Sequence, residues 1–368
     1  MAGAVYIFAG GGTGGHLLPA LAVAEELAAL APAARVVFAC SDRPIDRRIL
    51  QPTPHAVVPQ PIRPLPRGLV GWGGFLASAA ASRRLARALL RDLRPAAVLG
   101  LGGFAAVPVT YRAAKMHLPT ALLSIDAVPG LANRLLAGVV DVIFAQFRRT
   151  AAAYGRHGGK VRLVGLPVPW TLARGGAEEA RAFFGLRDDR RTLLVMAGSQ
   201  GAENVNRALA ALRADLEALS DDWQVLHIAG PGKLAEVQAA WRGSPMHHVA
   251  VEFCRRMELA YAAADVAVCR AGACTVGELA VTGTPAVLMP YPYHRDRQQW
   301  LNAEELVSAG GALVVADRTD PKLNASALGS ALLPLLREPG RLEAMRRASV
   351  SVSRPGAAEI VARWLAGG

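Results

Sequence analysis

Glycines crowd together directly after a short apolar run near the start of the sequence. Residues 10–15 read GGGTGG, and His16 follows at once. Glycine adopts positive φ freely, and the backbone N–H groups that open a helix attract negative oxygens. A helix start also disfavours the cationic form of a histidine, which suits a general base. The pattern predicts an anion- or oxyanion-binding turn with His16 as its base; a bare tight turn, and a His16 that only contacts backbone, are the structural alternatives.

The same loop contains the G-x-G-x-x-G spacing of dinucleotide-binding proteins. Asp42 stands near the end of the next strand-like run, where such proteins place a ribose-binding carboxylate. A hydride-transfer enzyme needs one dinucleotide site, whereas this sequence has a second glycine loop at residues 198–201. We therefore favour a sugar-nucleotide site, and a dehydrogenase stays open as an alternative.

Polar residues also follow the apolar runs of the second half. The loop at residues 198–201 offers N–H groups to a phosphate, and residues 270–278 open a helix with small residues that let a ligand approach the backbone. Thr275 fits a helix cap or a phosphate donor, and Glu278 suits both hydroxyls of a ribose. The spacing Thr275-x-x-Glu278 is equally that of a capping box, which is the structural alternative.

A third polar segment, residues 291–302, reads YPYHRDRQQWLN. Its Asp296, Gln298 and Gln299 carry carboxylate and amide groups, each of which makes several hydrogen bonds. These groups therefore suit the hydroxyl-rich surface of a sugar; a solvated loop before a helix is the alternative.

These groups need a scaffold that brings strand ends together, and the sequence alternates strand-like and helix-like segments. The expected strands are residues 5–9, 35–40, 96–100, 120–125, 139–145, 192–197, 224–228, 249–253, 265–269, 286–290 and 312–316. This alternation predicts an α/β fold with parallel sheets covered on both faces. Two glycine loops about half a chain apart predict two Rossmann-like, doubly wound domains with a ligand cleft between them.

The pattern pauses near Gly165, where Leu166-Pro167-Val168-Pro169 interrupts it. We therefore expect three parts: residues 1–166 and residues 167–344 as the two domains, and residues 345–368 as a helical segment packing back on the first domain.

Composition limits the class of protein. The 368 residues include 41 Lys and Arg against 29 Asp and Glu, for a net charge of +12, which predicts an acidic partner. A hydrophobic fraction of 52% with 19% charged residues excludes a disordered chain. Four cysteines without a C-x-x-C pair suggest neither a zinc site nor a disulfide scaffold, and fit a reducing cytoplasm. We expect neither a signal peptide nor a transmembrane helix, so any membrane contact is peripheral.

Seven arginines stand against one acid, Asp92, between residues 62 and 94. They are Arg63, Arg67, Arg83, Arg84, Arg87, Arg91 and Arg94, with Leu65, Leu69, Val70, Trp72, Phe75 and Leu76 among them. Basic residues beside apolar and aromatic bulk suit adsorption to an anionic leaflet, at ~1 kcal/mol per basic residue. An ordinary surface helix at residues 78–93 is the alternative, and both can hold. No recognition motif accompanies the charge, so nucleic acid is not expected as a partner.

Five segments together resemble the MurG family of peripheral-membrane glycosyltransferases, over nearly the whole chain. They are G-G-T-G-G-H (11–16), L-G-x-G-G-F (99–104), G-S-Q-G-A (198–202), C-R-A-G-A-x-T-V-x-E (269–278) and D-R-Q-Q-x-x-N (296–302). The resemblance implies a GT-B fold. It also implies transfer of N-acetylglucosamine from UDP-N-acetylglucosamine to O4 of the muramoyl sugar of lipid I, with inversion. This reaction makes lipid II for peptidoglycan at the cytoplasmic face of the inner membrane. By the resemblance, residues 1–166 face the acceptor and the membrane, and residues 167–344 bind the nucleotide sugar. No D-x-D pair stands in a motif position, so we expect transfer without a metal, with a loosely bound divalent cation as the alternative, and no cofactor.

The resemblance also implies which residues meet each substrate. On the donor side, backbone near Phe253 and Cys254 would meet the uracil and Glu278 the ribose. Ser199, Gln200 and Gly201, with Thr275 and Arg270, would meet the phosphates, and Gln298 and Gln299 the sugar. On the acceptor side, Gly12, Thr13, Gly14, Gly15, His16 and Asn133 would face lipid I and its pyrophosphate.

Two segments depart from the family pattern. Where the family has H-E-Q-N before x-x-x-G-x-x-N, this chain has Leu123-Ser124-Ile125-Asp126, and G-N-P-V-R is replaced by residues 165–169, without the arginine. We hypothesise that the Asp126 carboxylate orients or assists the catalytic base; a strand-end Asp that bonds the following turn is the alternative. The departures leave open a transferase with a different acceptor, or a non-catalytic UDP-sugar-binding homologue.

Overall fold

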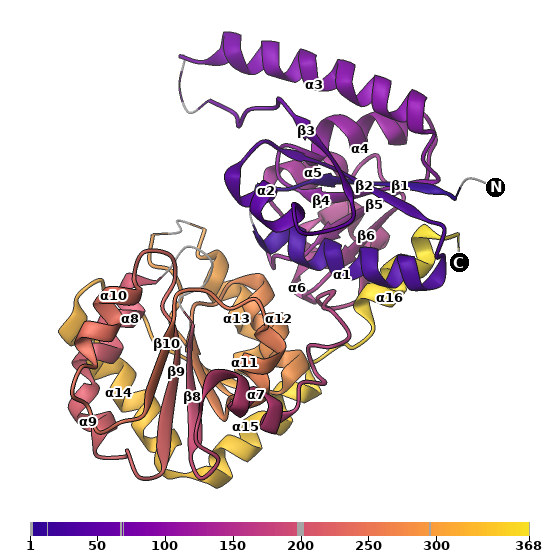
Figure 1. Cartoon of the computed structure of the whole chain (residues 1–368). Helices are drawn as coiled ribbons and strands as arrows, with labels where there is room; N and C mark the ends of the chain where they lie inside the picture. Colours follow the sequence, from indigo (N-terminus) through magenta and orange to yellow (C-terminus); the bar gives the residue numbers. More distant parts are fainter. Residues whose placement is uncertain are drawn as a thin grey trace. The chain divides into compact units, whose positions relative to one another are not determined.

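The computed structural model describes residues 3–12, 14–66, 68, 70–196, 202–293 and 296–367 (Figure 1). The chain divides into two compact α/β units: residues 1–169 with 354–368, and residues 170–353. The division differs from the boundaries expected at 166 and 344. Helix α15 (Pro339–Ser351) stays with the second unit, because it packs on α12 (Ala273–Thr282) and α14 (Pro321–Arg337).

The first unit contains a seven-stranded, fully parallel sheet in the order β3-β2-β1-β4-β5-β6-β7. Its strands are β1 (Val5–Gly10), β2 (Arg35–Ser41), β3 (Ala56–Gln60), β4 (Ala97–Gly102), β5 (Thr120–Ser124), β6 (Val142–Ala145) and β7 (Val161–Leu163). The edge strands β3 and β7 are missing from the sequence-based prediction, because β3 is largely exposed and contains Pro59 while β7 has only three residues.

Helices cover both faces of this sheet. They are α1 (Gly14–Leu30), α2 (Pro44–Leu50), α3 (Trp72–Leu93), α4 (Ala106–Lys115), α5 (Leu131–Leu136), α6 (Arg149–Ala153), the 3₁₀ helix Gly155–Lys160, and the last helix, α16 (Ala357–Leu365). α3 packs on α4, and α16 packs on α1 (Figure 1). On α16, the ring of Trp364 lies edge-on to that of Phe144, with 5.9 Å between the ring centroids. No helix among the described residues is long and apolar enough to cross a bilayer.

The second unit contains a six-stranded parallel sheet in the order β10-β9-β8-β11-β12-β13. Its strands are β8 (Arg191–Met196), β9 (Trp223–Ile228), β10 (His248–Val251), β11 (Val266–Cys269), β12 (Ala286–Leu288) and β13 (Ala312–Val314). Besides α12, α14 and α15, its helices are α7 (Ala177–Phe184), α8 (Glu203–Ala211), α9 (Arg213–Glu217), α10 (Leu234–Ala240), α11 (Met257–Ala263) and α13 (Gln298–Ser308).

Both sheets confirm the predicted fold class of two doubly wound, parallel α/β domains. In each sheet the strand order reverses between two central neighbours, β1 and β4 in the first unit and β8 and β11 in the second. Ligands of open α/β sheets bind at the carboxyl ends of such neighbouring strands. In the sequence, the predicted motifs stand at or directly after the ends of these four strands, at residues 10–15, 102–104, 198–201 and 270–272, of which 13 and 198–201 lie outside the described residues.

Candidate active site

The first glycine loop is held by a buried carboxylate that the sequence analysis did not single out. Gly12 N–H donates to both oxygens of Asp46, at 2.8 and 2.9 Å, and Ser41 Oγ donates to Asp46 Oδ2 at 2.5 Å. Gly10, Gly11 and Gly12 all have positive φ, and a Cβ on Gly11 would lie 2.7 Å from Asp46 Oδ2. Only glycine allows the loop to pass this close to the carboxylate. Asp46 therefore sets the path of the loop.

His16 and Asn133 both lie close to Gly102, the last residue of β4. A Cβ on Gly102 would lie 3.2 Å from His16 Nε2 and 3.3 Å from Asn133 Oδ1, so the two side chains converge on one point. His16 is the third residue of α1, and Asn133 lies on α5. The structure thus brings together the two acceptor-side residues that the sequence placed more than a hundred positions apart.

Asn133 is held in place by Tyr154 and Ser124. The Tyr154 hydroxyl donates to Ser124 Oγ at 3.0 Å and is also hydrogen-bonded to the Asn133 side chain. Burial raises the pKa of Tyr154 to about 12, against the opposing effect of these hydrogen bonds. Asn133 Oδ1 is buried and has no hydrogen-bond partner in the described structure. A buried acceptor without a partner is costly, so a ligand hydroxyl or N–H at this point would be stabilised.

Asp126 follows β5 and is partly exposed, and its backbone oxygen accepts a hydrogen bond from Thr150 Oγ1 at 3.3 Å. Its assistance to the base stays a prediction. Asp42, the residue on which the dehydrogenase alternative depends, is exposed and forms an ion pair with Arg47. Thr13 lies outside the described residues, and Gly14 and Gly15 open α1.

In the second unit, Glu278 lies on α12 against a buried tyrosine. Tyr261, on α11, donates its hydroxyl to Glu278 Oε2 at 2.8 Å. Burial raises the pKa of the Glu278 carboxyl, and the Tyr261 hydrogen bond acts against that rise. Burial and the nearby Glu278 charge raise the pKa of Tyr261 well above its ordinary value, so the phenol stays a donor at neutral pH. Tyr261 therefore orients the carboxyl group that is expected to bind the ribose.

The capping-box interpretation of Thr275 and Glu278 is wrong. α12 begins at Ala273 with Gly272 as its N-cap, and no side chain caps it. Thr275 is thus the third helical residue, three positions after the N-cap, and the Glu278 carboxyl is bound by Tyr261 instead. Both side chains are partly exposed, which leaves their predicted contacts with phosphate and ribose as predictions.

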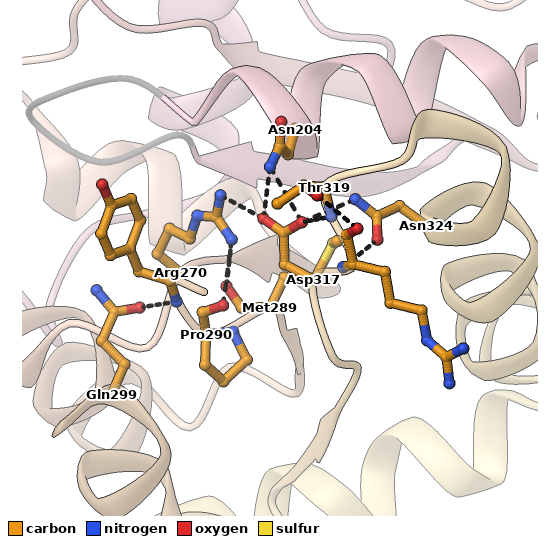
Figure 2. A network of polar contacts seen from close by, with 10 residues as sticks. Asn204, Arg270, Met289, Pro290, Gln299, Asp317, Thr319 and Asn324 are labelled. Carbon is orange, nitrogen blue, oxygen red and sulfur yellow. Dashed lines mark hydrogen bonds and ion pairs between the residues drawn. The ribbon is translucent and has the colours of Figure 1, made fainter. Parts of the chain in front are cut away.

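Arg270 is bound within the protein by a second buried carboxylate (Figure 2). Its Nη2 lies 2.8 Å from Asp317 Oδ2, and its Nη1 donates to the carbonyl oxygens of Met289 at 2.9 Å and Pro290 at 3.3 Å. The Arg270 side chain is only 12% exposed, and that of Asp317 is fully buried. The guanidinium thus joins the end of β11 to the segment that follows β12; its predicted contact with phosphate stays a prediction.

Asp317 also accepts hydrogen bonds from side chains at the starts of two helices, α8 and α14. Asn204, at the start of α8, donates to both carboxylate oxygens at 3.0 and 2.9 Å, and Asn324 donates at 2.9 Å (Figure 2). The N–H of Thr319 donates at 2.8 Å. Burial acts to raise the pKa of Asp317, but these hydrogen bonds and Arg270 outweigh it and hold the pKa below its ordinary value. The sequence analysis did not single out Asp317, although its position directly after the predicted strand at residues 312–316 is a signal that could have identified it.

The segment expected to meet the sugar is ordered by local hydrogen bonds. Gln299 Oε1 accepts from Tyr291 N–H at 2.8 Å, and Asp296 Oδ1 accepts from Gln298 N–H at 3.2 Å. The amide oxygen of Gln299 is therefore occupied, which leaves its NH₂ group to donate to a ligand. The Asp296 carboxylate is bonded to the backbone of Gln298, the first residue of α13.

Phe253 and Cys254, the residues expected near the uracil, can also be located, whereas three residues expected near the phosphates lie outside the described residues. Phe253 is 48% exposed in the loop after β10, whereas Cys254 is buried and burial raises its pKa. Ser199, Gln200 and Gly201 lie outside the described residues. Among the residues that the structure describes, no group of three or more His, Cys, Asp or Glu side chains is placed to hold a metal ion.

Two doubly wound units with polar loops at their strand switch points define a nucleotide-sugar enzyme of the GT-B class. Residues 6–145 match the family model described as "Glycosyltransferase family 28 N-terminal domain". Residues 192–361 match the model described as "Glycosyltransferase family 28 C-terminal domain". A protein of Mycobacterium bovis (strain BCG / Pasteur 1173P2), called UDP-N-acetylglucosamine--N-acetylmuramyl-(pentapeptide) pyrophosphoryl-undecaprenol N-acetylglucosamine transferase, is 37% identical over 97% of this chain and 87% of its own. A Mycobacterium sp. (strain KMS) protein of the same name is 37% identical over 98% and 97%.

Solved structures agree with this class. The crystal structure of Acinetobacter baumannii MurG superimposes with a TM-score of 0.76 at 25% identity, covering 99% of this chain and 100% of that one. UDP-GlcNAc 2-epimerase from Neisseria meningitidis shares the fold, with a TM-score of 0.67 at 14% identity over 99% and 100%. The chain belongs to glycosyltransferase family 28 and, within it, to the MurG family. The dehydrogenase alternative is therefore wrong, and the enzyme is a glycosyltransferase.

Asp46→Asn tests whether the buried carboxylate holds the first glycine loop. The amide would turn an NH₂ group toward the N–H of Gly12 or the hydroxyl of Ser41, which removes one acceptor. We expect the free energy of unfolding to fall by about 1–3 kcal/mol, measured by chemical denaturation. Asp42→Asn is the matched control, because exposed ion pairs contribute little. Equal effects of the two substitutions would contradict the assignment.

The raised pKa of Glu278 predicts a pH dependence of UDP binding. Affinity should fall as the pH drops through that raised pKa, because protonation removes the carboxylate that accepts from the ribose. Glu278→Gln should bind UDP at least about tenfold more weakly at neutral pH and lose this dependence in calorimetric titrations. Without ligand the same variant should melt at a higher temperature, since folding favours the protonated carboxyl and its ionisation at neutral pH costs stability. A pH dependence that persists in the variant would exclude Glu278 as its source.

Proposed function

We propose that this chain transfers N-acetylglucosamine from UDP-N-acetylglucosamine to N-acetylmuramyl-pentapeptide carried on undecaprenyl pyrophosphate, the step that makes lipid II from lipid I. The observation that carries the proposal is 37% identity over 97% of the chain to a transferase named for this reaction. The convergence of His16 with Asn133, and of Tyr261 with Glu278, supports it.

The second unit holds the donor. Glu278, with one carboxyl oxygen fixed by Tyr261, accepts from the ribose, and the NH₂ group of Gln299 donates to the sugar. Backbone near Phe253 and Cys254 meets the uracil. Negative charge grows on the UDP leaving group, and N–H groups of the loop at residues 198–201 and of the α12 start stabilise it.

The first unit presents the acceptor. His16 takes the proton of the attacking sugar hydroxyl, whose oxygen bonds to the anomeric carbon as the bond to UDP breaks on the opposite face. Attack from the opposite face inverts that carbon. Asn133 Oδ1, buried beside His16 Nε2, accepts from a hydroxyl or N–H of the acceptor and so orients it.

A second candidate is a UDP-sugar transferase with a different acceptor, or a homologue that binds UDP-sugar without turnover. It is favoured by residues 123–126, where Leu-Ser-Ile-Asp replaces the family's H-E-Q-N. Ser124 is here part of the buried contact with Tyr154. This segment of the acceptor side therefore departs from the family pattern, whereas His16, Asn133 and the donor motifs at residues 198–202, 269–278 and 296–302 match it.

We also propose that the first unit adsorbs peripherally to the anionic cytoplasmic face of the membrane. Val70, Trp72 and Leu76, at the start of α3, are 92%, 44% and 60% exposed, and we call them the apolar patch. Arg63, Arg83, Arg84, Arg87, Arg91 and Arg94 are exposed nearby in sequence, while Ser78, Ser82, Ala86 and Leu90 form the buried side of α3. Arg67 and Leu69 lie outside the described residues. No nucleic acid partner is proposed.

His16→Ala tests the base. Transfer of labelled N-acetylglucosamine to a lipid I analogue should fall by at least about a hundredfold, the usual contribution of a general base. UDP binding should stay unchanged, because His16 lies in the other unit from Glu278. His117→Asn, an exposed histidine in the same unit, is the control. Transfer that survives at the wild-type rate would remove His16 from the mechanism; absence of transfer by the wild type to this acceptor alone would favour the second candidate.

Trp72→Ala combined with Leu76→Ser tests the apolar patch. Binding to vesicles containing an anionic lipid should weaken by at least about tenfold in co-sedimentation, and wild-type binding should fall as salt is added. Trp170→Ala is a matched control, because Trp170 is 60% exposed but belongs to the second unit. If the control weakens binding as much as the double variant, the apolar patch is not the membrane contact.

A further inference from the structure

We propose that Asp317 is a positioning residue for donor binding, acting through Arg270 and Asn204. The inference rests on the proposed function, because it concerns how the donor site of the second unit is built. Asp317 lies just past β13 and no predicted motif includes it. Its side chain is fully buried and accepts hydrogen bonds from three side chains and one backbone N–H.

The first step is that Asp317 joins two helix starts. Asn204 is the second residue of α8 and follows the glycine loop at residues 198–201, which is expected to meet the phosphates. Arg270 precedes α12, the helix that carries Thr275 and Glu278. Both side chains converge on the one carboxylate (Figure 2). The spacing of the two helix starts therefore depends on Asp317.

The second step links Asp317 to the sugar-binding segment. Arg270 donates to the carbonyl oxygens of Met289 and Pro290, and the next residue, Tyr291, donates its N–H to Gln299 Oε1 (Figure 2). The Tyr291 ring also lies against the guanidinium, 5.8 Å from its Cζ atom to the ring centroid. A displaced Arg270 would thus shift the backbone that sets the direction of Gln299.

The third step concerns charge. A phosphate ligand and Asp317 would compete for the same guanidinium, and Asp317 already contacts it at 2.8 Å in a nearly dry environment. A buried ion pair with this geometry holds its partners in place, and removing one charge leaves the other uncompensated. Arg270 therefore acts as a link between loops, and its loss of contact with Asp317 should weaken donor binding rather than strengthen it.

Asp317→Asn separates the two roles of Arg270. If Asp317 positions the site, UDP should bind at least about tenfold more weakly by calorimetry, and the KM for UDP-N-acetylglucosamine should rise while the KM for the acceptor stays the same. If Arg270 is instead a phosphate ligand restrained by Asp317, the variant should bind UDP as tightly as the wild type or more tightly. That second result would overturn the inference.

Asp320→Asn is the matched control, because it removes an exposed acid three residues away whose carboxylate accepts the N–H of Leu323 at the start of α14. Should Asp317→Asn fail to fold, Asn204→Ala cuts the link to α8 alone at a partly exposed position, and the same rise in donor KM is expected. Unchanged donor KM in Asn204→Ala would then overturn the inference. Failure of the wild type to bind UDP would instead refute the proposed function.

Discussion

The site depends on how buried carboxylates take up the hydrogen-bond donors of loops at the carboxyl edge of a parallel sheet. Beyond the end of a strand, the backbone N–H groups of the loop are no longer paired within the sheet and need other hydrogen-bond acceptors. Asp46 in the first unit and Asp317 in the second provide these partners, and both side chains are buried. A buried carboxylate is stable only when it is fully hydrogen-bonded, so it holds each donor in one place.

The two carboxylates bind different kinds of donor in the two units. Asp46 binds the glycine loop directly through the N–H of Gly12, so the loop backbone itself is fixed beside His16. Asp317 binds side chains, and Arg270 passes its effect on to the segment after β12. Direct backbone fixation suits a rigid turn that presents a base, whereas side-chain links gather loops from several strands around a larger ligand.

The acceptor side combines retained and altered residues. Asn133 and His16, both expected on the acceptor side, converge on Gly102, but the segment at 123–126 reads Leu-Ser-Ile-Asp in place of the family's H-E-Q-N. Tyr154 is hydrogen-bonded both to Ser124 and to the Asn133 side chain, and so holds Asn133 in place. The amide oxygen of Asn133 is buried and has no hydrogen-bond partner in the described structure. Asn133 is therefore oriented by two residues, Ser124 and Tyr154, that the family motifs do not include.

The sequence alone predicts the fold class, eleven of the strands, and the segments that carry His16, Glu278 and Gln299, because strand periodicity and glycine turns are local properties. It could not reveal the roles of Asp46, Tyr261 and Asp317. Their bonds join residues 34, 17 and up to 113 positions apart. It also left Thr275 ambiguous, since a capping box and a ligand site share one spacing. These contacts become visible in the folded chain, because the strand order, and not the distance along the sequence, brings the loop ends to one edge of a sheet.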